Sequence, residues 1–119
     1  DRTTLNGDVC NKIGTYLKAL AAFDNNIPFY VALPCSTIDV EISDGLMEIP
    51  IENRSVDEIY KISGLNCKGE RTEVTSYYDD LTNYLNPAFD VTPSNLITGL
   101  ITEKGVIKSS KEEITKILK

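Results

Sequence analysis

Residues 27–33 read Ile-Pro-Phe-Tyr-Val-Ala-Leu, an apolar run without a charged side chain. A short continuous apolar segment of this kind is typical of a strand that is covered on both faces inside a parallel sheet. We therefore expect a buried parallel strand here. Residues 37–42 follow with a weak alternation of apolar and polar side chains, which fits an edge strand or an extended loop.

Helical spacing is found on both sides of this strand. Apolar residues recur three and four positions apart over residues 8–24, which predicts an amphipathic helix that ends at the two asparagines before the strand. Downstream, residues 55–58 read Ser-Val-Asp-Glu and have the form of a capping box, in which the Ser and Glu side chains bind free backbone N–H groups. This pattern predicts a short helix through Ile62, closed by Gly64.

The last third of the chain contains a further strand and two further helices. Residues 65–85 are polar and are expected to form a loop, and residues 86–90 form a short apolar element that we take as the last strand or its exit. Thr92-Pro93 predicts a helix start with Pro at the first helical position, and Gly105 should end that helix. Its buried stripe would consist of Leu96, Ile97, Leu100 and Ile101.

A final helix should begin at Ser110, with Glu113 three residues further on. The order helix, strand, helix, strand, helix is that of one half of a doubly wound sheet. The prediction is an α/β fold, a Rossmann-like three-layer sandwich with a mostly parallel sheet, of which residues 1–119 are the C-terminal part.

Composition limits the classes of function. The chain has 119 residues, enough for one domain, with 41% hydrophobic and 25% charged residues, as in ordinary globular proteins. A net charge of −6 argues against nucleic acid or an anionic membrane as a partner. No stretch is long and apolar enough for a membrane span, and no signal peptide is visible. We expect a cytoplasmic location.

The residue types also limit the chemistry. Histidine is absent, which excludes Ser-His-Asp and Cys-His catalysis and His-based zinc sites within these residues. The three cysteines, Cys10, Cys35 and Cys67, are far apart and show no C-x-x-C spacing, so we expect buried structural residues and no metal site. Acid–base work must fall to Asp, Glu, Lys, Tyr or Cys.

The opening stretch offers a candidate anion site. Asn6-Gly7 permits a tight turn, Asp8 can cap, and Asn11 and Lys12 would lie in the first turn of the predicted helix. A lysine at a helix N-terminus opposes the helix dipole, and a bound phosphate or sugar oxygen would explain its position. The alternative is a solvated lysine after a plain capping turn, and spacing alone does not decide between the two.

Several blocks of sequence resemble one family. They are Asp1-Arg2, Asn6-Gly7-Asp8, residues 11–16, residues 27–32, Ser36-Thr37-Ile38-Asp39, residues 49–52, residues 86–93, residues 96–98 and residues 101–107. Together they resemble the C-terminal domain of the 5-methylthioribose-1-phosphate isomerases, which share a family with the regulatory subunits of translation initiation factor 2B. The family usually has a shorter connection than residues 65–85.

The resemblance implies an aldose–ketose isomerase of methionine salvage that needs no metal or organic cofactor. Asp1 matches the family's catalytic acid, and Asn11 and Lys12 match a pair that contacts the sugar-phosphate substrate. With the phosphate on the anomeric carbon, the ring cannot open as a hemiacetal, so an acid that protonates the ring oxygen is valuable. Asp1 can fill that role near neutral pH if burial or neighbours raise its pKa above about 3.9.

The resemblance also implies partners and alternatives. The family's catalytic cysteine lies upstream of this domain, so we expect the N-terminal part of the enzyme as a partner, a homodimer, and little activity or solubility for residues 1–119 alone. One alternative is a non-catalytic regulatory subunit of the initiation factor 2B type. Others are a ribose-1,5-bisphosphate isomerase and a pure dimerisation domain.

Overall fold

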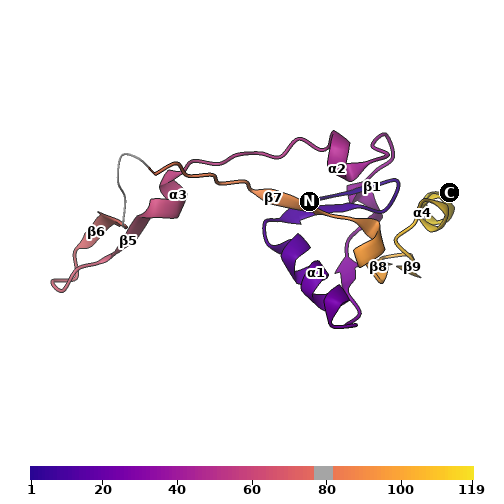
Figure 1. Cartoon of the computed structure of the whole chain (residues 1–119), viewed down its shortest axis with the longest axis horizontal. Helices are drawn as coiled ribbons and strands as arrows, with labels where there is room; N and C mark the ends of the chain where they lie inside the picture. Colours follow the sequence, from indigo (N-terminus) through magenta and orange to yellow (C-terminus); the bar gives the residue numbers. More distant parts are fainter. Residues whose placement is uncertain (77–81) are drawn as a thin grey trace. The chain divides into compact units, whose positions relative to one another are not determined.

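The computed structural model describes residues 1–76 and 82–119, which form two compact units (Figure 1). Unit 1 consists of residues 1–51 and 89–119, and unit 2 of residues 52–88. The elements of unit 1 are β1 (Arg2–Thr4), β2 (Val9–Lys12), α1 (Thr15–Asp24), β3 (Tyr30–Ala32), the 3₁₀ helix Cys35–Thr37, β4 (Ile38–Asp39), α2 (Gly45–Glu48), β7 (Phe89–Thr92), the 3₁₀ helix Ser94–Leu96, β8 (Gly99–Thr102), β9 (Gly105–Ile107) and α4 (Lys111–Leu118).

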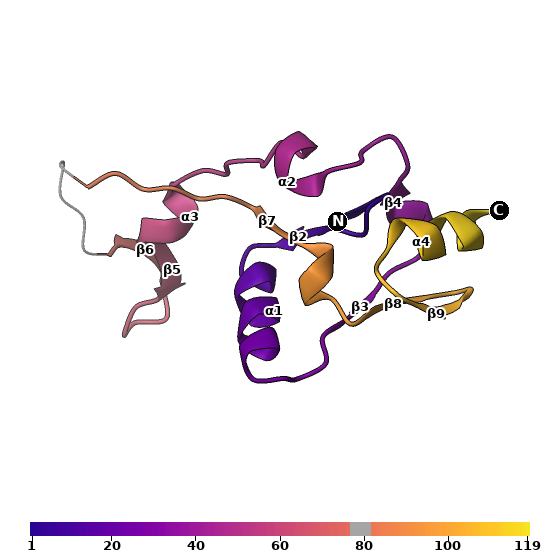
Figure 2. The same ribbon diagram turned by 45° about the vertical axis from the view of Figure 1, so that its right-hand side comes forward.

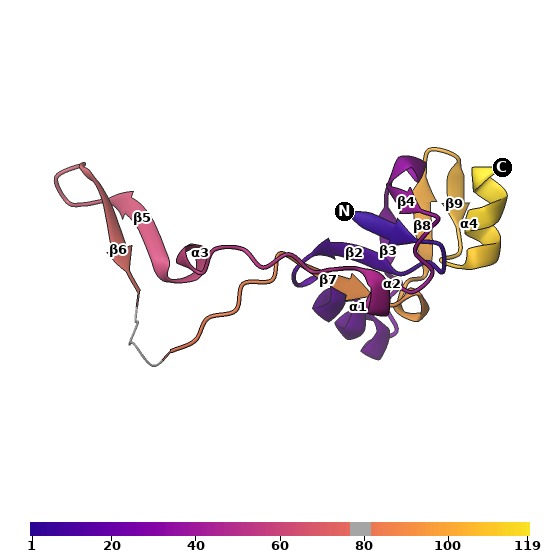
Figure 3. The same ribbon diagram turned by 90° about the horizontal axis from the view of Figure 1, so that it is seen from above.

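A four-stranded sheet in the order β4-β1-β2-β7 forms one side of unit 1 (Figure 3). β2 pairs antiparallel with both β1 and β7, whereas β1 and the short edge strand β4 are parallel. The turn between β1 and β2 needs glycine at position 7, where φ is 94° and an added Cβ would lie 2.6 Å from the Ser109 hydroxyl oxygen. That hydroxyl donates a 2.7 Å hydrogen bond to the Gly7 carbonyl, which ties the turn to the start of α4.

The second sheet of unit 1 has the order β3-β8-β9, with a parallel β3–β8 pair and a β8–β9 hairpin. The core lies between the two sheets and α4, and its buried side chains are Val9, Ile97, Leu100 and Ile114. Helix α4 begins as predicted, because the Ser110 hydroxyl accepts a hydrogen bond from the Glu113 N–H and Ile114 is fully buried.

The apolar run at residues 27–33 contains a parallel strand, as predicted, but only residues 30–32 pair. The prediction that it is covered on both faces is wrong for these residues: Tyr30 is 50% exposed and Ala32 is also exposed. β3 pairs on one side only, with β8, and so forms an edge of its sheet. The prediction for residues 37–42 is confirmed by the two-residue edge strand β4.

The predicted helix over residues 8–24 is wrong in its first half. Residues 9–12 form the strand β2, and α1 starts only at Thr15. Val9 and Cys10 are buried because strands pair on both sides of β2, and this long-range pairing overrides a helical spacing that the sequence also fits. Asn11 and Lys12 therefore lie at the end of a strand rather than in the first turn of a helix.

The predicted helix from Thr92 to Gly105 is also wrong. After β7, one 3₁₀ turn over residues 94–96 leads into the hairpin of β8 and β9, in which Gly105 begins β9 and pairs with Thr102. Leu100 is fully buried, as predicted, but as a strand residue between β3 and β9. The prediction is wrong because a short apolar run occurs in buried strands as well as in buried helices, and its spacing does not distinguish the two.

Unit 2 contains a one-turn helix and a hairpin (Figure 2): α3 (Asp57–Tyr60), β5 (Lys61–Leu65) and β6 (Arg71–Thr75). The capping box does not form, because the Ser55 hydroxyl accepts from the Asp57 N–H and the Glu58 carboxylate binds Arg54. The helix thus ends before Ile62, and the predicted loop contains a strand. Residues 77–81 of that predicted loop lie outside the described residues.

The fold is α/β, as predicted, while the mostly parallel Rossmann-like sheet is not confirmed. Parallel pairing in the described parts is limited to β1–β4 and β3–β8, and the other strand pairs are antiparallel. Among the helices of residues 1–76 and 82–119, none has the length and apolarity that a bilayer crossing requires.

Candidate active site

The β1–β2 hairpin brings the first predicted site residues together. Its register places Arg2 opposite Cys10, so the next position along the ladder places Asp1 beside Asn11. The α-amino group of Asp1 donates a 3.0 Å hydrogen bond to the Cys10 carbonyl, which holds the two backbones side by side. Asp1 and Asn11 are both exposed, so a carboxylate and a carboxamide are available to a ligand at this end of the sheet.

Lys12 follows on the same strand and contacts an aromatic ring. Lys12 and Phe89 are direct partners across β2 and β7, and the Lys12 ammonium lies 4.7 Å from the centre of the Phe89 ring. This distance is within the range of a cation–π interaction. Among the described residues, no carboxylate forms an ion pair with Lys12.

Asp90, the next residue of β7, binds the start of helix α1. Its carboxylate accepts hydrogen bonds from the backbone N–H groups of Gly14 at 2.7 Å and Tyr16 at 3.1 Å. The residue before the helix, Gly14, has no side chain to cap it, so Asp90 supplies the cap from another strand. Opposite strand partners project to one face, so Asn11 and Asp90 share a face, and Lys12 and Phe89 share the other.

A hollow of about 470 Å³ opens beside Asp1. Asp1, Arg2 and residues 36–41 line it, from β1, the 3₁₀ helix and β4. Arg2 and Asp39 form an ion pair across it, with 3.3 Å between guanidinium nitrogen and carboxylate oxygen. The hollow therefore presents a carboxylate, an exposed guanidinium and the polar Ser36 to a ligand of sugar size.

Asp8 has a larger role than the capping that its sequence position predicts. It is 4% exposed, and its carboxylate accepts hydrogen bonds from Asn6 Nδ2 at 2.7 Å, from the Gly45 N–H at 3.0 Å and from the Ser94 N–H at 2.9 Å. The turn, α2 and the segment after β7 are thus joined at one buried charge. Glycine is needed at position 45, because an added Cβ would lie 2.8 Å from the Asp8 Cβ.

The cysteines differ in accessibility. The prediction that all three are buried is confirmed for Cys10 on β2, but it is wrong for the half-buried Cys35 and the exposed Cys67; all three are free thiols. Burial raises the pKa of the Cys10 thiol, so the protonated form dominates near neutral pH. Within the described ranges, no three His, Cys, Asp or Glu residues gather closely enough to hold a metal ion.

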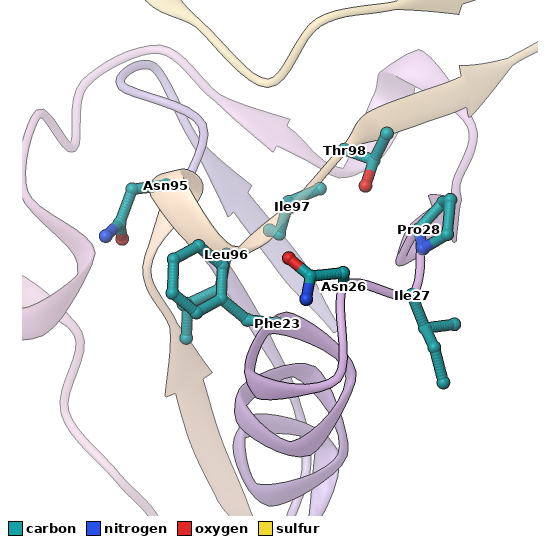
Figure 4. Close-up of a pocket in the computed structure, with 8 residues that line it drawn as sticks. All are labelled: Phe23, Asn26, Ile27, Pro28, Asn95, Leu96, Ile97 and Thr98. Atoms are coloured by element: carbon teal, nitrogen blue, oxygen red, sulfur yellow. The ribbon is translucent and has the colours of Figure 1, made fainter.

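A second hollow, of about 410 Å³, lies between the C-terminal end of α1 and the segment before β8 (Figure 4). Phe23, Asn26, Ile27, Pro28, Asn95, Leu96, Ile97 and Thr98 line it. None of these side chains titrates near neutral pH, so this hollow has no acid–base group to offer. The candidate active site is therefore the end of the sheet that carries Asp1, Asn11 and Lys12.

Sequence reasoning identified Asp1, Asn11 and Lys12, but it missed Phe89, Asp90 and the pairing of Arg2 with Asp39. The only available signal was the polar residue at the end of the apolar block 86–90, which no local rule connects with residues 12–16. The contacts depend on strand pairing between distant segments. The structure also shows no hydrogen bond between the side chains of Asp1, Asn11 and Lys12, whereas Asn11 Nδ2 donates to the Thr15 hydroxyl at 3.3 Å.

Comparison with known proteins gives consistent results. Methylthioribose-1-phosphate isomerase of Methylocella silvestris is 64% identical over 110 residues, which are 92% of this chain and 30% of that protein. The enzyme of the same name from Desulfatibacillum aliphaticivorans is 56% identical over 117 residues, which are 98% of this chain and 31% of that protein. The chain thus spans about 30% of the length of these relatives.

Two solved structures are also similar. The crystal structure of 5-methylthioribose 1-phosphate isomerase from Pyrococcus horikoshii matches with a TM-score of 0.81 and 41% identity, over 99% of this chain and 30% of that one. Translation initiation factor eIF-2B subunit delta from A. fulgidus matches with a TM-score of 0.77 and 37% identity, over 99% of this chain and 31% of that one. The family model described as "Initiation factor 2 subunit family" matches residues 1–109, which confirms the resemblance read from the sequence: the chain belongs to the initiation factor 2 subunit family.

Proposed function

We propose that residues 1–119 supply the general acid and part of the substrate site of an isomerase that converts 5-methylthioribose 1-phosphate to 5-methylthioribulose 1-phosphate. One observation carries the proposal: β1 and β2 place Asp1 beside Asn11, with Lys12 next in the strand and free of any carboxylate partner in the described ranges. The relatives that are 54–64% identical and bear the isomerase name support it.

The proposed roles follow from the chemistry of the substrate. Asp1 protonates the ring oxygen of the sugar, because the phosphate on the anomeric carbon prevents ordinary ring opening. Lys12 holds a phosphate or sugar oxygen through a charge-assisted hydrogen bond, and Asn11 binds a sugar hydroxyl. Asp1 and Asn11 are exposed here, so substrate and further protein segments must cover them before water is excluded.

A wider organisation is part of the proposal. Residues 1–119 act as the C-terminal catalytic part of a Rossmann-like domain, in a cytoplasmic homodimeric enzyme that works without metal or organic cofactor. The family's catalytic cysteine then lies outside these residues, and Cys10, Cys35 and Cys67 have no catalytic role in this proposal.

The similarity to an eIF-2B delta subunit favours a second candidate, a non-catalytic regulatory subunit. In that case Asp1 would have no catalytic role, and a sugar phosphate or nucleotide would be at most a sensed ligand. The two candidates differ in whether a protein that contains these residues turns the sugar phosphate over at all.

A chimaera tests the proposal. The chain replaces the matching segment of the Methylocella silvestris isomerase, which is 64% identical, and the parent enzyme serves as the control. We expect the chimaera to isomerise the substrate, and Asp1→Asn to lower kcat by about 10²-fold or more while KM changes little. Asp24→Asn, at the exposed C-terminal end of α1, is the matched control and should retain activity. A folded but inactive chimaera would favour the regulatory candidate, whereas full turnover in Asp1→Asn would refute the acid role of Asp1.

A further inference from the structure

We propose that Phe89 is a positioning residue for substrate binding: its ring holds the Lys12 ammonium in place and does not occupy it as a carboxylate would, so that the phosphate of the substrate meets a lysine in a fixed position. The inference rests on the proposed function, and it assigns a role to a side chain that the sequence alone does not connect with the site.

The first step is the geometry of the pair. Lys12 and Phe89 are direct partners in an antiparallel ladder that also pairs Asn11 with Asp90, so the backbone fixes which residue lies beneath the lysine. The ammonium lies 4.7 Å from the ring centre, and the ring is half-buried while the lysine is exposed. The ring thus restricts a long flexible side chain at its charged end.

The second step is the choice of partner. A carboxylate beneath Lys12 would neutralise the ammonium and compete with a phosphate for it, whereas an aromatic face attracts the cation and leaves its N–H donors free. The nearest acid along β7 is Asp90, and both its oxygens accept from the backbone of residues 14 and 16. Among the described residues, no carboxylate therefore competes with a phosphate for the Lys12 ammonium.

The third step excludes the competing anion site. The N-terminus of the ten-residue helix α1 lies directly after Lys12 and would otherwise attract a phosphate. The Asp90 carboxylate already binds there, and its charge repels a second anion. At this end of the sheet, the group that binds the phosphate of a sugar phosphate is consequently Lys12, so the affinity for the substrate depends on the position of Lys12.

The test is a set of substitutions in the chimaera described above. Phe89→Leu keeps an apolar side chain but removes the aromatic face, and we expect KM for 5-methylthioribose 1-phosphate to rise about two- to fivefold with kcat nearly unchanged, the range of an exposed cation–π contact. Phe89→Tyr should restore KM. Phe23→Leu is the matched control, because Phe23 is an exposed phenylalanine on α1 and should leave KM unchanged.

Other results would overturn the inference. If Phe89 is merely structural, Phe89→Leu will lower the melting temperature and the active fraction, and KM will stay at the value of the Phe23→Leu control. If the chimaera itself is inactive while the parent enzyme works, the proposed function fails. A second measurement then decides on Phe89: NMR of the Lys12 side chain, where the ring-current shift of its ε-CH₂ protons should disappear in Phe89→Leu and return in Phe89→Tyr. An unchanged Lys12 signal in Phe89→Leu refutes the contact.

Discussion

The carboxylate of Asp90 accepts a 2.7 Å hydrogen bond from the backbone N–H of Gly14, 76 residues earlier in the sequence. A second bond, from the Tyr16 N–H at 3.1 Å, completes a helix cap that comes from a different strand. The start of α1 and the strand end with Asn11 and Lys12 are thereby fixed to β7, so the stability of the helix and the geometry of the candidate site depend on one side chain.

Removing this cap should weaken the protein measurably. We expect Asp90→Ala to lower the free energy of unfolding by about 0.5–2 kcal/mol, because helix N–H groups lose their acceptor, and Asp90→Asn to lower it by less. Urea denaturation of the chimaera measures the change. Asp24→Ala, which removes an acid at the C-terminal end of the same helix, should be neutral or slightly stabilising; equal losses in the two alanine variants would contradict the cap.

Substitution of Asp8 should be more costly. Asp8→Ala removes the acceptor of three hydrogen bonds at a 4% exposed position, and leaves the Gly45 and Ser94 N–H groups without it. We expect a loss of about 2–4 kcal/mol, because bonds to a charged group each contribute about 1.5–3 kcal/mol and are not additive. Thermal unfolding of the chimaera provides the measurement. A loss no greater than that of Asp90→Ala would show that the buried carboxylate is not the main tie between these segments.

Two apolar residues in the hairpin of β8 and β9 should contribute very different amounts to the free energy of unfolding. Leu100 is fully buried in the core cluster, so Leu100→Ala should cost about 2–5 kcal/mol. Val106, on the paired strand, is 64% exposed, and Val106→Ala should cost less than about 1 kcal/mol. Comparable losses at both positions, measured by urea denaturation, would mean that a further segment covers Val106.

The cysteines should react in a fixed order. Cys67 is exposed and should be alkylated by iodoacetamide first, and the half-buried Cys35 more slowly. Cys10 is 1% exposed and burial raises its pKa, so it lacks both access and thiolate at neutral pH and should react only after denaturation. Peptide mass spectrometry identifies the labelled residue, and rapid labelling of Cys10 in the native protein would contradict its burial.

Of the two local capping signals in the sequence, the one at Ser110 was confirmed and the one at Ser55 was wrong. Ser110 with Glu113 correctly predicted the start of α4, because a cap depends on residues within one turn. Residues 9–12 and 99–102 were assigned to helices, although they form the strands β2 and β8, since their pairing partners lie up to 83 residues away in the sequence (Val9 opposite Thr92). Hydrophobic spacing alone does not contain that information.

The candidate site, too, could be predicted only in part from the sequence. Asp1, Asn11 and Lys12 were identified by resemblance, and the β1–β2 register explains why two of them meet. Phe89 and Asp90 contact residues 12–16 only through the β2–β7 pairing. Such contacts depend on tertiary structure and cannot be read from spacing.

Unit 2 leaves and rejoins the rest of the chain through neighbouring backbones: the Ala88 N–H donates to the Glu52 carbonyl at 2.8 Å, and Asn53 and Pro87 form a β-bridge. If the residues between Asn53 and Pro87 were removed, the two remaining backbones would therefore lie about 5 Å apart, which is the spacing of one cross-strand pair. Evolution can lengthen, shorten or replace this segment without shifting the register of any strand in unit 1. Unit 1 of such a protein can be inherited almost unchanged while the segment between residues 53 and 87 diverges, and a laboratory can use the same junction to graft a foreign domain.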